Sequence, residues 1–92
     1  MKQTALITGG SKRIGRAITE FLAENGWNVI IHYNSSENPA QELAKELKRK
    51  FPNQSFQPVQ ANLSNIKEIE RLIPQVIDEI GRFQLLVNNA SV

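Results

Sequence analysis

A short apolar strand that runs through a glycine-rich turn directly into a helix is the feature that most limits how this chain can fold. Residues 4–8 are apolar and β-branched and stop at Gly9 and Gly10, as a buried strand does. Gly26 suits the left-handed position that ends the following helix. The apolar residues of that helix recur at a spacing that predicts its inner face: Ile14, Ala17, Ile18, Phe21 and Leu22.

The same alternation of strand and helix continues along the chain. Residues 29–33 predict a second strand, and Asn38 with Pro39 predicts the cap and first turn of a second helix. Residues 55–60 predict a third strand, in which Pro58 favours an edge position because it cannot donate to a sheet. The predicted inner face of the second helix is Ala40, Leu43, Ala44 and Leu47.

A third helix and a fourth strand complete the pattern. Asn65 with Glu68 resembles a capping box, and Pro74 is expected to kink or split the helix that follows. Gly81 ends this helix, and residues 85–87 predict the fourth strand. Helices between nearly continuous apolar strands indicate a parallel sheet covered on both faces. With right-handed crossovers, the prediction is an α/β Rossmann fold: a doubly wound β-α-β-α-β-α-β half with strand order 3-2-1-4 over residues 1–92.

Composition excludes several classes of protein. The 92 residues contain no cysteine and one histidine, which excludes disulfides and does not favour a metal site. A net charge of +2 is too small an excess to predict a nucleic-acid partner. No apolar run approaches transmembrane length, and no signal peptide is recognisable. We therefore expect a cytoplasmic protein with no membrane partner.

The turn after the first strand is the candidate binding site. In doubly wound sheets a ligand lies outside the carboxyl ends of the strands, where the strand order reverses. Gly9 permits a tight turn, Gly15 lets the helix lie close to the strand, and the amides at the helix start face any anion placed there. Lys12 and Arg13 add positive charge. A helix start that merely needs small residues is the alternative interpretation.

The end of the second strand favours NADP(H) over NAD(H). An NAD site needs an acidic residue there, but residues 31–36 contain no carboxylate. Asn34, Ser35 and Ser36 can donate to the extra phosphate of NADP, and Arg13 can reach it with a charge-assisted bond. His32 is interpreted as a strand-end residue with a satisfied hydrogen bond, and a second-line phosphate contact is the alternative. Tyr33 belongs to the adenosine end of this pocket rather than to acid catalysis.

Two motifs resemble those of the short-chain dehydrogenase/reductase family. Residues 8–15 resemble its cofactor turn, Thr-Gly-x-x-x-Gly-x-Gly, and residues 88–91 resemble its Asn-Asn-Ala-Gly signature. Residues 61–63 are similar to the family's Asp-Val/Leu adenine clamp. Arg13, Asn62 and Ser91 depart from the family pattern. The combination of Lys-Arg-Ile-Gly at residues 12–15, His-Tyr-Asn-Ser-Ser at residues 32–36 and Asn-Asn-Ala-Ser at residues 88–91 looks most like the pteridine reductase branch.

The resemblance implies a role for each matching residue. Residues around the turn would wrap the pyrophosphate and adenine ribose, Asn62 and Leu63 would border the adenine, and residues 89–91 would pass under the nicotinamide-side ribose. Thr8 would tie the first strand to the fourth. The predicted cofactor-binding residues are Gly9, Ser11, Lys12, Arg13, Ile14, Gly15, His32, Tyr33, Asn34, Ser35, Ser36, Asn62, Leu63, Asn89, Ala90 and Ser91.

The implied function is an oxidoreductase that transfers hydride between NADPH and a small substrate, such as a pterin or dihydrofolate. A 3-oxoacyl-acyl-carrier-protein ketoreductase or a sugar dehydrogenase is the alternative within the family. A non-catalytic NADP-sensing module and a structural domain without a ligand are alternatives of other classes. The family's catalytic Tyr-x-x-x-Lys pair does not occur in the 92 residues. We therefore predict no catalytic residue here, expect the segment to be an N-terminal half that is inactive alone, and expect a homo-oligomer, by resemblance a tetramer.

Overall fold

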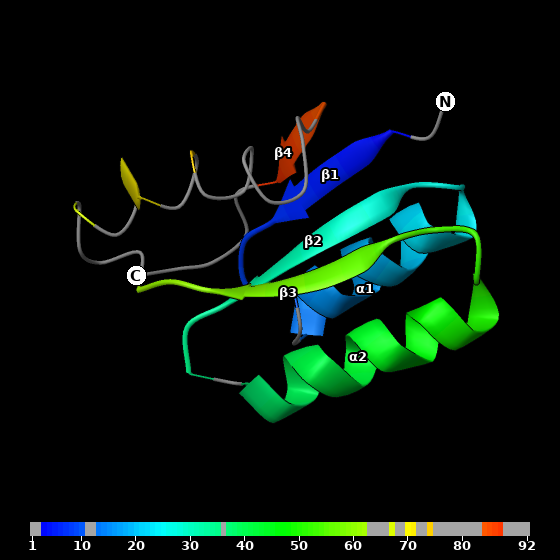
Figure 1. Cartoon of the computed structure of the whole chain (residues 1–92), viewed down its shortest axis with the longest axis horizontal. Coiled ribbons are helices and arrows are strands. Elements are labelled where there is room, and N and C mark those ends of the chain that lie inside the picture. Colours follow the sequence, from blue (N-terminus) through cyan, green and yellow to red (C-terminus); the bar gives the residue numbers. More distant parts are fainter. Residues whose placement is uncertain are drawn as a thin grey trace.

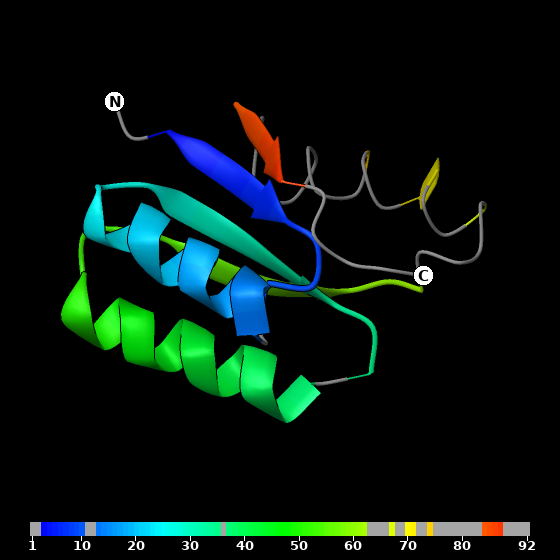
Figure 2. The same ribbon diagram turned by 180° about the vertical axis from the view of Figure 1, so that it is seen from behind.

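The computed structural model describes residues 3–10, 13–35, 37–62, 67, 70–71, 74 and 84–87. These residues form a parallel four-stranded sheet in the order β3-β2-β1-β4. Both described helices, α1 and α2, cover the same face of this sheet (Figures 1 and 2). The elements are β1 Thr4–Ile7, α1 Arg13–Glu24, β2 Asn28–Tyr33, α2 Glu37–Lys50, β3 Phe56–Gln60 and β4 Leu85–Val87.

The strand order is the one that the sequence predicts, and each strand lies within one residue of its predicted bounds. β1 is central, with Ile7 opposite Ile31 of β2 and Val87 of β4. β3 pairs only with β2 in the described sheet, and Pro58 lies opposite Ile31. The edge position inferred from Pro58 is therefore confirmed. Because all four strands are parallel, their carboxyl ends meet at one edge of the sheet.

The main core lies between the sheet and the two helices. Alternate residues of β1 and β2 point into it, with Ala5, Ile7, Val29 and Ile31 at most 1% exposed. The inner face of α2 is the predicted one: Ala40, Leu43, Ala44 and Leu47 are all buried. The intervening strand residues, among them Leu6, Ile30 and His32, are also buried. By the same alternation they face the side of the sheet away from α1 and α2.

The predicted inner face of α1 is wrong in part. Leu22 is buried and Ile18 is half-buried, but Ile14 is 70% exposed, Phe21 is 63% exposed and Ala17 is also exposed. The residues that face the sheet are instead Gly15, Thr19, Leu22 and Ala23. Small residues at a spacing of four allow the helix to approach the strands closely, and this approach decides which face is buried.

The ends of the helices follow from local sequence. Gly26 has φ of 89°, the amide of Trp27 bonds the carbonyl of Leu22 at 3.0 Å, and the amide of Gly26 bonds that of Ala23 at 3.2 Å. This is a Schellman motif, as the glycine predicts. α2 begins at Glu37, one residue before the predicted cap at Asn38. Pro39 lies in the first turn, where its missing N–H costs no helical bond.

Part of the predicted architecture lies outside the described residues. Of the segment expected to form a third helix, residues 67, 70, 71 and 74 are described, and each is helical. The predicted kink at Pro74, the helix end at Gly81 and the cover on the second face of the sheet are not described. Within the described part of the chain, no helix has the length and apolarity to cross a membrane. The same residues contain no group of three potential metal ligands.

Candidate functional site

The predicted site residues that the structure describes gather at the carboxyl edge of the sheet. Gly9 follows β1, Arg13 starts α1, Asn34 follows β2 and Asn62 follows β3. The segments come from distant parts of the sequence, and the parallel strands bring them to one edge, where ligands bind in sheets of this kind. The remaining predicted residues lie outside the described part of the chain: Ser11, Lys12, Ser36, Leu63, Asn89, Ala90 and Ser91.

The turn after β1 begins with two hydrogen bonds that connect the end of β1 to β4. The amide of Thr8 donates to the carbonyl of Val87 at 3.0 Å, and the Thr8 hydroxyl donates to the same oxygen at 3.2 Å. The expectation that Thr8 ties the first strand to the fourth is confirmed. Gly9 follows with φ of 63°, a left-handed conformation that glycine adopts without steric cost. Thr8 and Gly9 therefore direct the chain out of β1 and across the edge of the sheet.

His32, at the end of β2, holds the next part of this turn. The Gly9 amide donates to His32 Nδ1 at 3.0 Å, and the Gly10 amide donates to the His32 carbonyl at 3.0 Å. On the far side of the ring, Nε2 lies 2.8 Å from the carbonyl oxygen of Ala61. Both ring nitrogens are thus engaged within the protein, as the strand-end interpretation predicts. This arrangement leaves the ring no donor for the alternative, a contact to phosphate.

The pKa of His32 reflects its surroundings. The residue is 2% exposed, and burial lowers the pKa of the ring below its ordinary value, while the hydrogen bond to the Ala61 carbonyl acts in the opposite direction. Desolvation disfavours the charged form of a buried histidine. The ring is therefore neutral in the folded protein at neutral pH.

Thr19 is a site residue that the sequence interpretation missed. Its hydroxyl is fully buried and lies 3.0 Å from the carbonyl oxygen of Gly10 and 2.8 Å from that of Gly15. One hydroxyl proton is shared between these two acceptors. The contact joins the middle of α1 to the turn and fixes the helix against it. A polar residue four positions after Gly15, on a helix expected to be apolar inside, was the available signal.

Replacing Thr19 with valine is expected to lower the free energy of unfolding by about 1 kcal/mol. Valine has nearly the same shape but leaves the buried carbonyls of Gly10 and Gly15 without their hydroxyl donor. Denaturant unfolding of the intact protein measures the change. The matched control is Thr19→Ser, which keeps the hydroxyl and loses the methyl group. A serine variant that is less stable than the valine variant would assign the role of Thr19 to packing.

Arg13 begins α1 in an unusual backbone conformation. Its φ is 52°, the single positive value among the described residues other than glycine. A left-handed backbone costs a non-glycine residue about 1–2 kcal/mol. The side chain is exposed and forms no ion pair with the described residues. The charge is therefore presented to solvent at the head of the helix, next to the turn.

The end of β2 carries neutral polar groups. Asn34 and Ser35 are exposed, and the Asn34 carbonyl accepts a hydrogen bond from the side chain of Gln60 at 2.9 Å. Tyr33 is half-buried and packs against the hydrophobic core. No carboxylate occurs among the described residues between the end of β2 and the start of α2. The first acidic residue after β2 is thus Glu37, at the start of α2.

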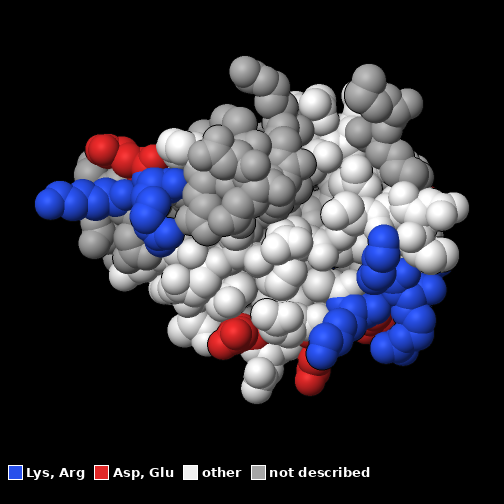
Figure 3. Space-filling model, viewed as in Figure 1, with Lys and Arg blue, Asp and Glu red and all other residues white. Residues whose placement is uncertain are grey.

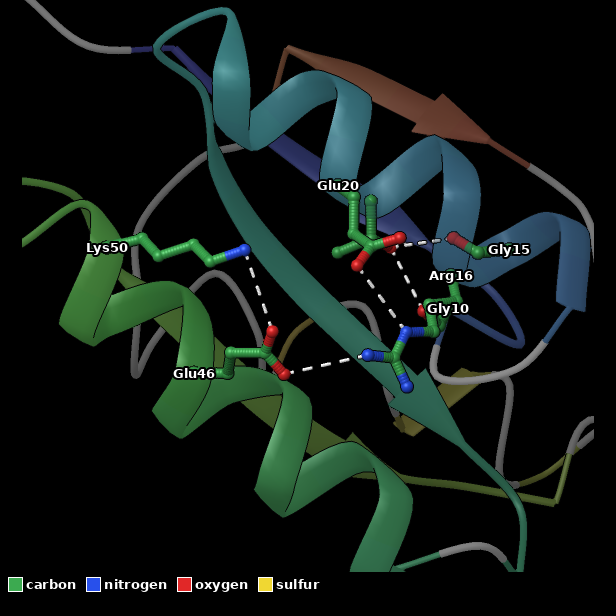
Figure 4. A network of polar contacts seen from close by, with 7 residues as sticks. Gly10, Gly15, Arg16, Glu20, Glu46 and Lys50 are labelled. Carbon is green, nitrogen blue, oxygen red and sulfur yellow. Dashed lines mark hydrogen bonds and ion pairs between the residues drawn. The ribbon is translucent and has the colours of Figure 1, made fainter.

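Three ion pairs of the described residues lie along α1 and α2. Arg16 reaches Glu20 at 3.5 Å and Glu46 of α2 at 3.6 Å, and Lys50 reaches Glu46 at 3.6 Å (Figure 4). These side chains are at least 37% exposed, so each pair contributes less than about 1 kcal/mol. The last turn of α2 is also basic, and Figure 3 shows lysine and arginine gathered there. Because α2 leads to the start of β3, this cluster lies at the edge opposite the candidate site.

Comparison with known proteins identifies the family. A family model described as short chain dehydrogenase matches residues 3–92. The chain belongs to the short-chain dehydrogenase family. Among curated relatives, the 3-oxoacyl-[acyl-carrier-protein] reductase FabG of Staphylococcus aureus (strain Mu50 / ATCC 700699) is 39% identical to this chain over 92 residues. The match covers 100% of this chain and 37% of that reductase.

Solved structures that are similar to this chain include complexes with NADP and NADPH. FolM alternative dihydrofolate reductase 1 from Brucella canis, complexed with NADP, is similar with a TM-score of 0.86 and 39% identity, over 98% of this chain and 34% of that one. A blue fluorescent protein from a metagenomic library, in complex with NADPH, has a TM-score of 0.87 and 33% identity, over 98% and 36% of the two chains. The chain thus spans about a third of the length of these relatives.

Proposed function

We propose that this chain is the NADP(H)-binding part of a short-chain dehydrogenase that transfers hydride between NADPH and a small substrate. The observation that carries the proposal is the exposed Arg13 at the head of α1, beside a strand end without a carboxylate. A guanidinium and neutral donors attract the 2′-phosphate of NADP(H), whereas an NAD site needs an acid for the ribose hydroxyls. The complexes of two similar proteins with NADP or NADPH give independent support.

The described residues fit such a cofactor. Gly15 is buried where α1 approaches β1, so the start of the helix can lie close to a pyrophosphate. The amides of Gly9 and Gly10 are bonded to His32, so in this proposal they shape the turn, and amides further along it meet the phosphates. Arg13, Asn34 and Ser35 would hold the 2′-phosphate, and Asn62 would border the adenine.

In this proposal the cofactor and the chain have separate roles. Bound NADPH supplies the hydride. The residues of this chain bind and orient the dinucleotide at the edge of the sheet, and the doubly wound sheet would be completed by a helical layer on its second face. By its resemblance to the family, proton transfer to the substrate would use a Tyr-x-x-x-Lys pair, which does not occur in these 92 residues. Their one tyrosine, Tyr33, packs against the core. The proposal therefore assigns cofactor binding, and no catalytic residue, to residues 1–92.

Two substrate classes have specific support. The first is a pterin or dihydrofolate, because the chain is similar to the NADP complex of an alternative dihydrofolate reductase. The second is a 3-oxoacyl thioester, because FabG matches the whole chain at 39% identity. We favour the first, since residues 12–15, 32–36 and 88–91 together resemble the pteridine reductase branch. Oxidation of NADPH by the intact protein, with dihydrofolate or acetoacetyl thioester as the acceptor, distinguishes the two classes.

Titration of the intact protein with the two nicotinamide cofactors tests the proposal. NADPH is expected to bind at least about tenfold more tightly than NADH, because charge-assisted hydrogen bonds to the 2′-phosphate are absent with NADH. Isothermal titration calorimetry gives both dissociation constants. Tighter binding of NADH would overturn the cofactor preference, and failure to bind either cofactor would refute a nucleotide site altogether.

A further inference from the structure

His32 is the residue through which three strand ends meet. Its carbonyl and its ring hold the amides of Gly10 and Gly9 after β1, and the opposite side of the ring holds the carbonyl of Ala61 after β3. The side chain is 2% exposed, so water cannot replace these bonds.

The partners of the ring determine its chemical form. The Gly9 N–H can only donate, so Nδ1 must accept, and the Ala61 carbonyl can only accept, so Nε2 must donate. The single form that satisfies both is the neutral ring with its proton on Nε2. A protonated ring would set an Nδ1–H against the Gly9 N–H and break the bond that holds the start of the turn.

We infer that His32 is a positioning residue for the dinucleotide site: its neutral ring holds Gly9 in the conformation that receives NADP(H), and protonation releases Gly9, while the Gly10 amide stays bonded to the His32 carbonyl. The inference rests on the proposed cofactor function. Burial, which lowers the pKa of His32, keeps the ring in its working form at neutral pH. Since the folded state favours the neutral ring, this contribution is complete above the ordinary histidine pKa near 6.5 and is lost as the pH falls through the lowered value.

Other titratable groups also change charge with pH, so their positions relative to His32 matter for this test. The flanking strands β1 and β3 contain no titratable side chain. Tyr33 alternates to the other face, where it packs against the core, and α1 and α2 lie on that face too (Figure 2). The described charged residues on these helices and beyond β3 are Arg13, Arg16, Glu20, Glu24, Glu37, Glu42, Lys45, Glu46, Lys48, Arg49, Lys50, Lys67, Glu70 and Arg71.

Two variants each remove one of the two hydrogen bonds of the His32 ring, so that the effect of each bond can be measured by itself. In His32→Asn the amide oxygen can take the place of Nδ1 and accept from Gly9, while the bond to Ala61 is lost. In His32→Gln the longer amide can donate to Ala61 in place of Nε2, while the acceptor for Gly9 is lost. Each variant removes one hydrogen bond from the same buried position, so thermal unfolding of the two should be similar. At about pH 8 we expect His32→Asn to bind NADPH within about threefold of wild type and His32→Gln to bind about tenfold more weakly.

The pH profile of NADPH binding tests the protonation step. The 2′-phosphate itself gains a proton near pH 6 and weakens binding to every variant, so the comparison is between wild type and His32→Asn. As the pH falls below the ordinary histidine pKa near 6.5, wild type is expected to lose affinity more steeply than His32→Asn, because only the wild-type ring gains a proton. Parallel profiles, or tighter wild-type binding in acid, would overturn the inference. So would equal loss of affinity in the two variants at about pH 8.

A spectroscopic measurement on the wild-type protein does not depend on either variant folding. Nitrogen NMR of the His32 ring is expected to show the Nε2–H neutral form near pH 7, and an Nδ1–H form would contradict the inferred role. The outcome also separates this inference from the proposed function. A wild-type protein that binds no NADPH at about pH 8 refutes the proposed function, whereas NADPH binding with parallel pH profiles refutes only the role of His32.

Discussion

Replacing Gly10 with alanine is expected to lower the free energy of unfolding by about 1–3 kcal/mol and to weaken NADPH binding by about tenfold. A Cβ at this position would lie 3.1 Å from three atoms: Cβ and the carbonyl oxygen of Ile7, and the hydroxyl oxygen of Thr19. Ile7 lies in the central strand and Thr19 is buried in α1. Neither neighbour can move away, so the turn itself must shift. Denaturant unfolding and NADPH titration of the intact protein measure the two effects.

Gly26 offers the matched control for this variant. It has φ of 89°, and a Cβ built there meets no atom within 4 Å. Alanine at position 26 should therefore cost about 1 kcal/mol through backbone strain alone. Because Gly26 lies at the other end of α1 from the turn, its alanine variant should bind NADPH like wild type. Equal effects of the two variants on NADPH affinity would show that Gly10 does not shape the binding turn.

The order of the sheet could be predicted because its strands are marked locally. Apolar runs bounded by glycine, proline or asparagine identify each strand, and the rule of right-handed crossovers then leaves few topologies. Pro58 even indicated which strand lies at the edge, because its missing N–H is tolerated there. Each of these signals is contained in a few adjacent residues. None of them requires knowledge of which distant residues touch.

The buried face of α1 could not be predicted from hydrophobicity. Ile14 and Phe21 are more apolar than Gly15 and Thr19, yet the smaller residues face the sheet. The helix must approach β1 closely to lie beside the turn, and bulky side chains on that face would prevent it. The hydroxyl of Thr19 then bonds Gly10, a contact across nine residues that no periodicity reveals. At the candidate site, the face of α1 that the hydrophobic pattern predicts to be buried is therefore not the face that packs against the sheet.

The site itself was predictable in composition but not in conformation. The sequence indicated a charge at Arg13 and the lack of an acid after β2, because both depend only on residue type. It gave no sign of the left-handed backbone of Arg13 or of the ring bonds of His32. The partner of Nε2, Ala61, lies 29 residues further along the chain. Only the pairing of β2 with β3 brings the two together.

Replacing Arg13 with glycine is expected to weaken NADPH binding by about ten- to a hundredfold, while NADH binding changes less than about threefold. Glycine removes the proposed guanidinium partner of the 2′-phosphate, which NADH lacks. The same variant should unfold no more easily than wild type. Glycine adopts φ of 52° without the left-handed strain, which offsets its larger loss of backbone entropy. Affinity and stability therefore change independently, and titration with both cofactors alongside denaturant unfolding measures each.

Two further variants show whether the loss of NADPH affinity depends on the location of Arg13 or only on the loss of one positive charge. Arg16→Ala removes an equal charge from α1, but that guanidinium is bound to Glu20 and Glu46, so cofactor selectivity should stay unchanged. Arg13→Lys keeps both the charge and the strained backbone but loses the planar pair of donors, so selectivity should fall only in part. If Arg13→Gly weakened NADPH and NADH equally, Arg13 would serve the turn shared by both cofactors. The preference for NADP(H) would then have to come from Asn34 and Ser35, the neutral donors at the end of β2.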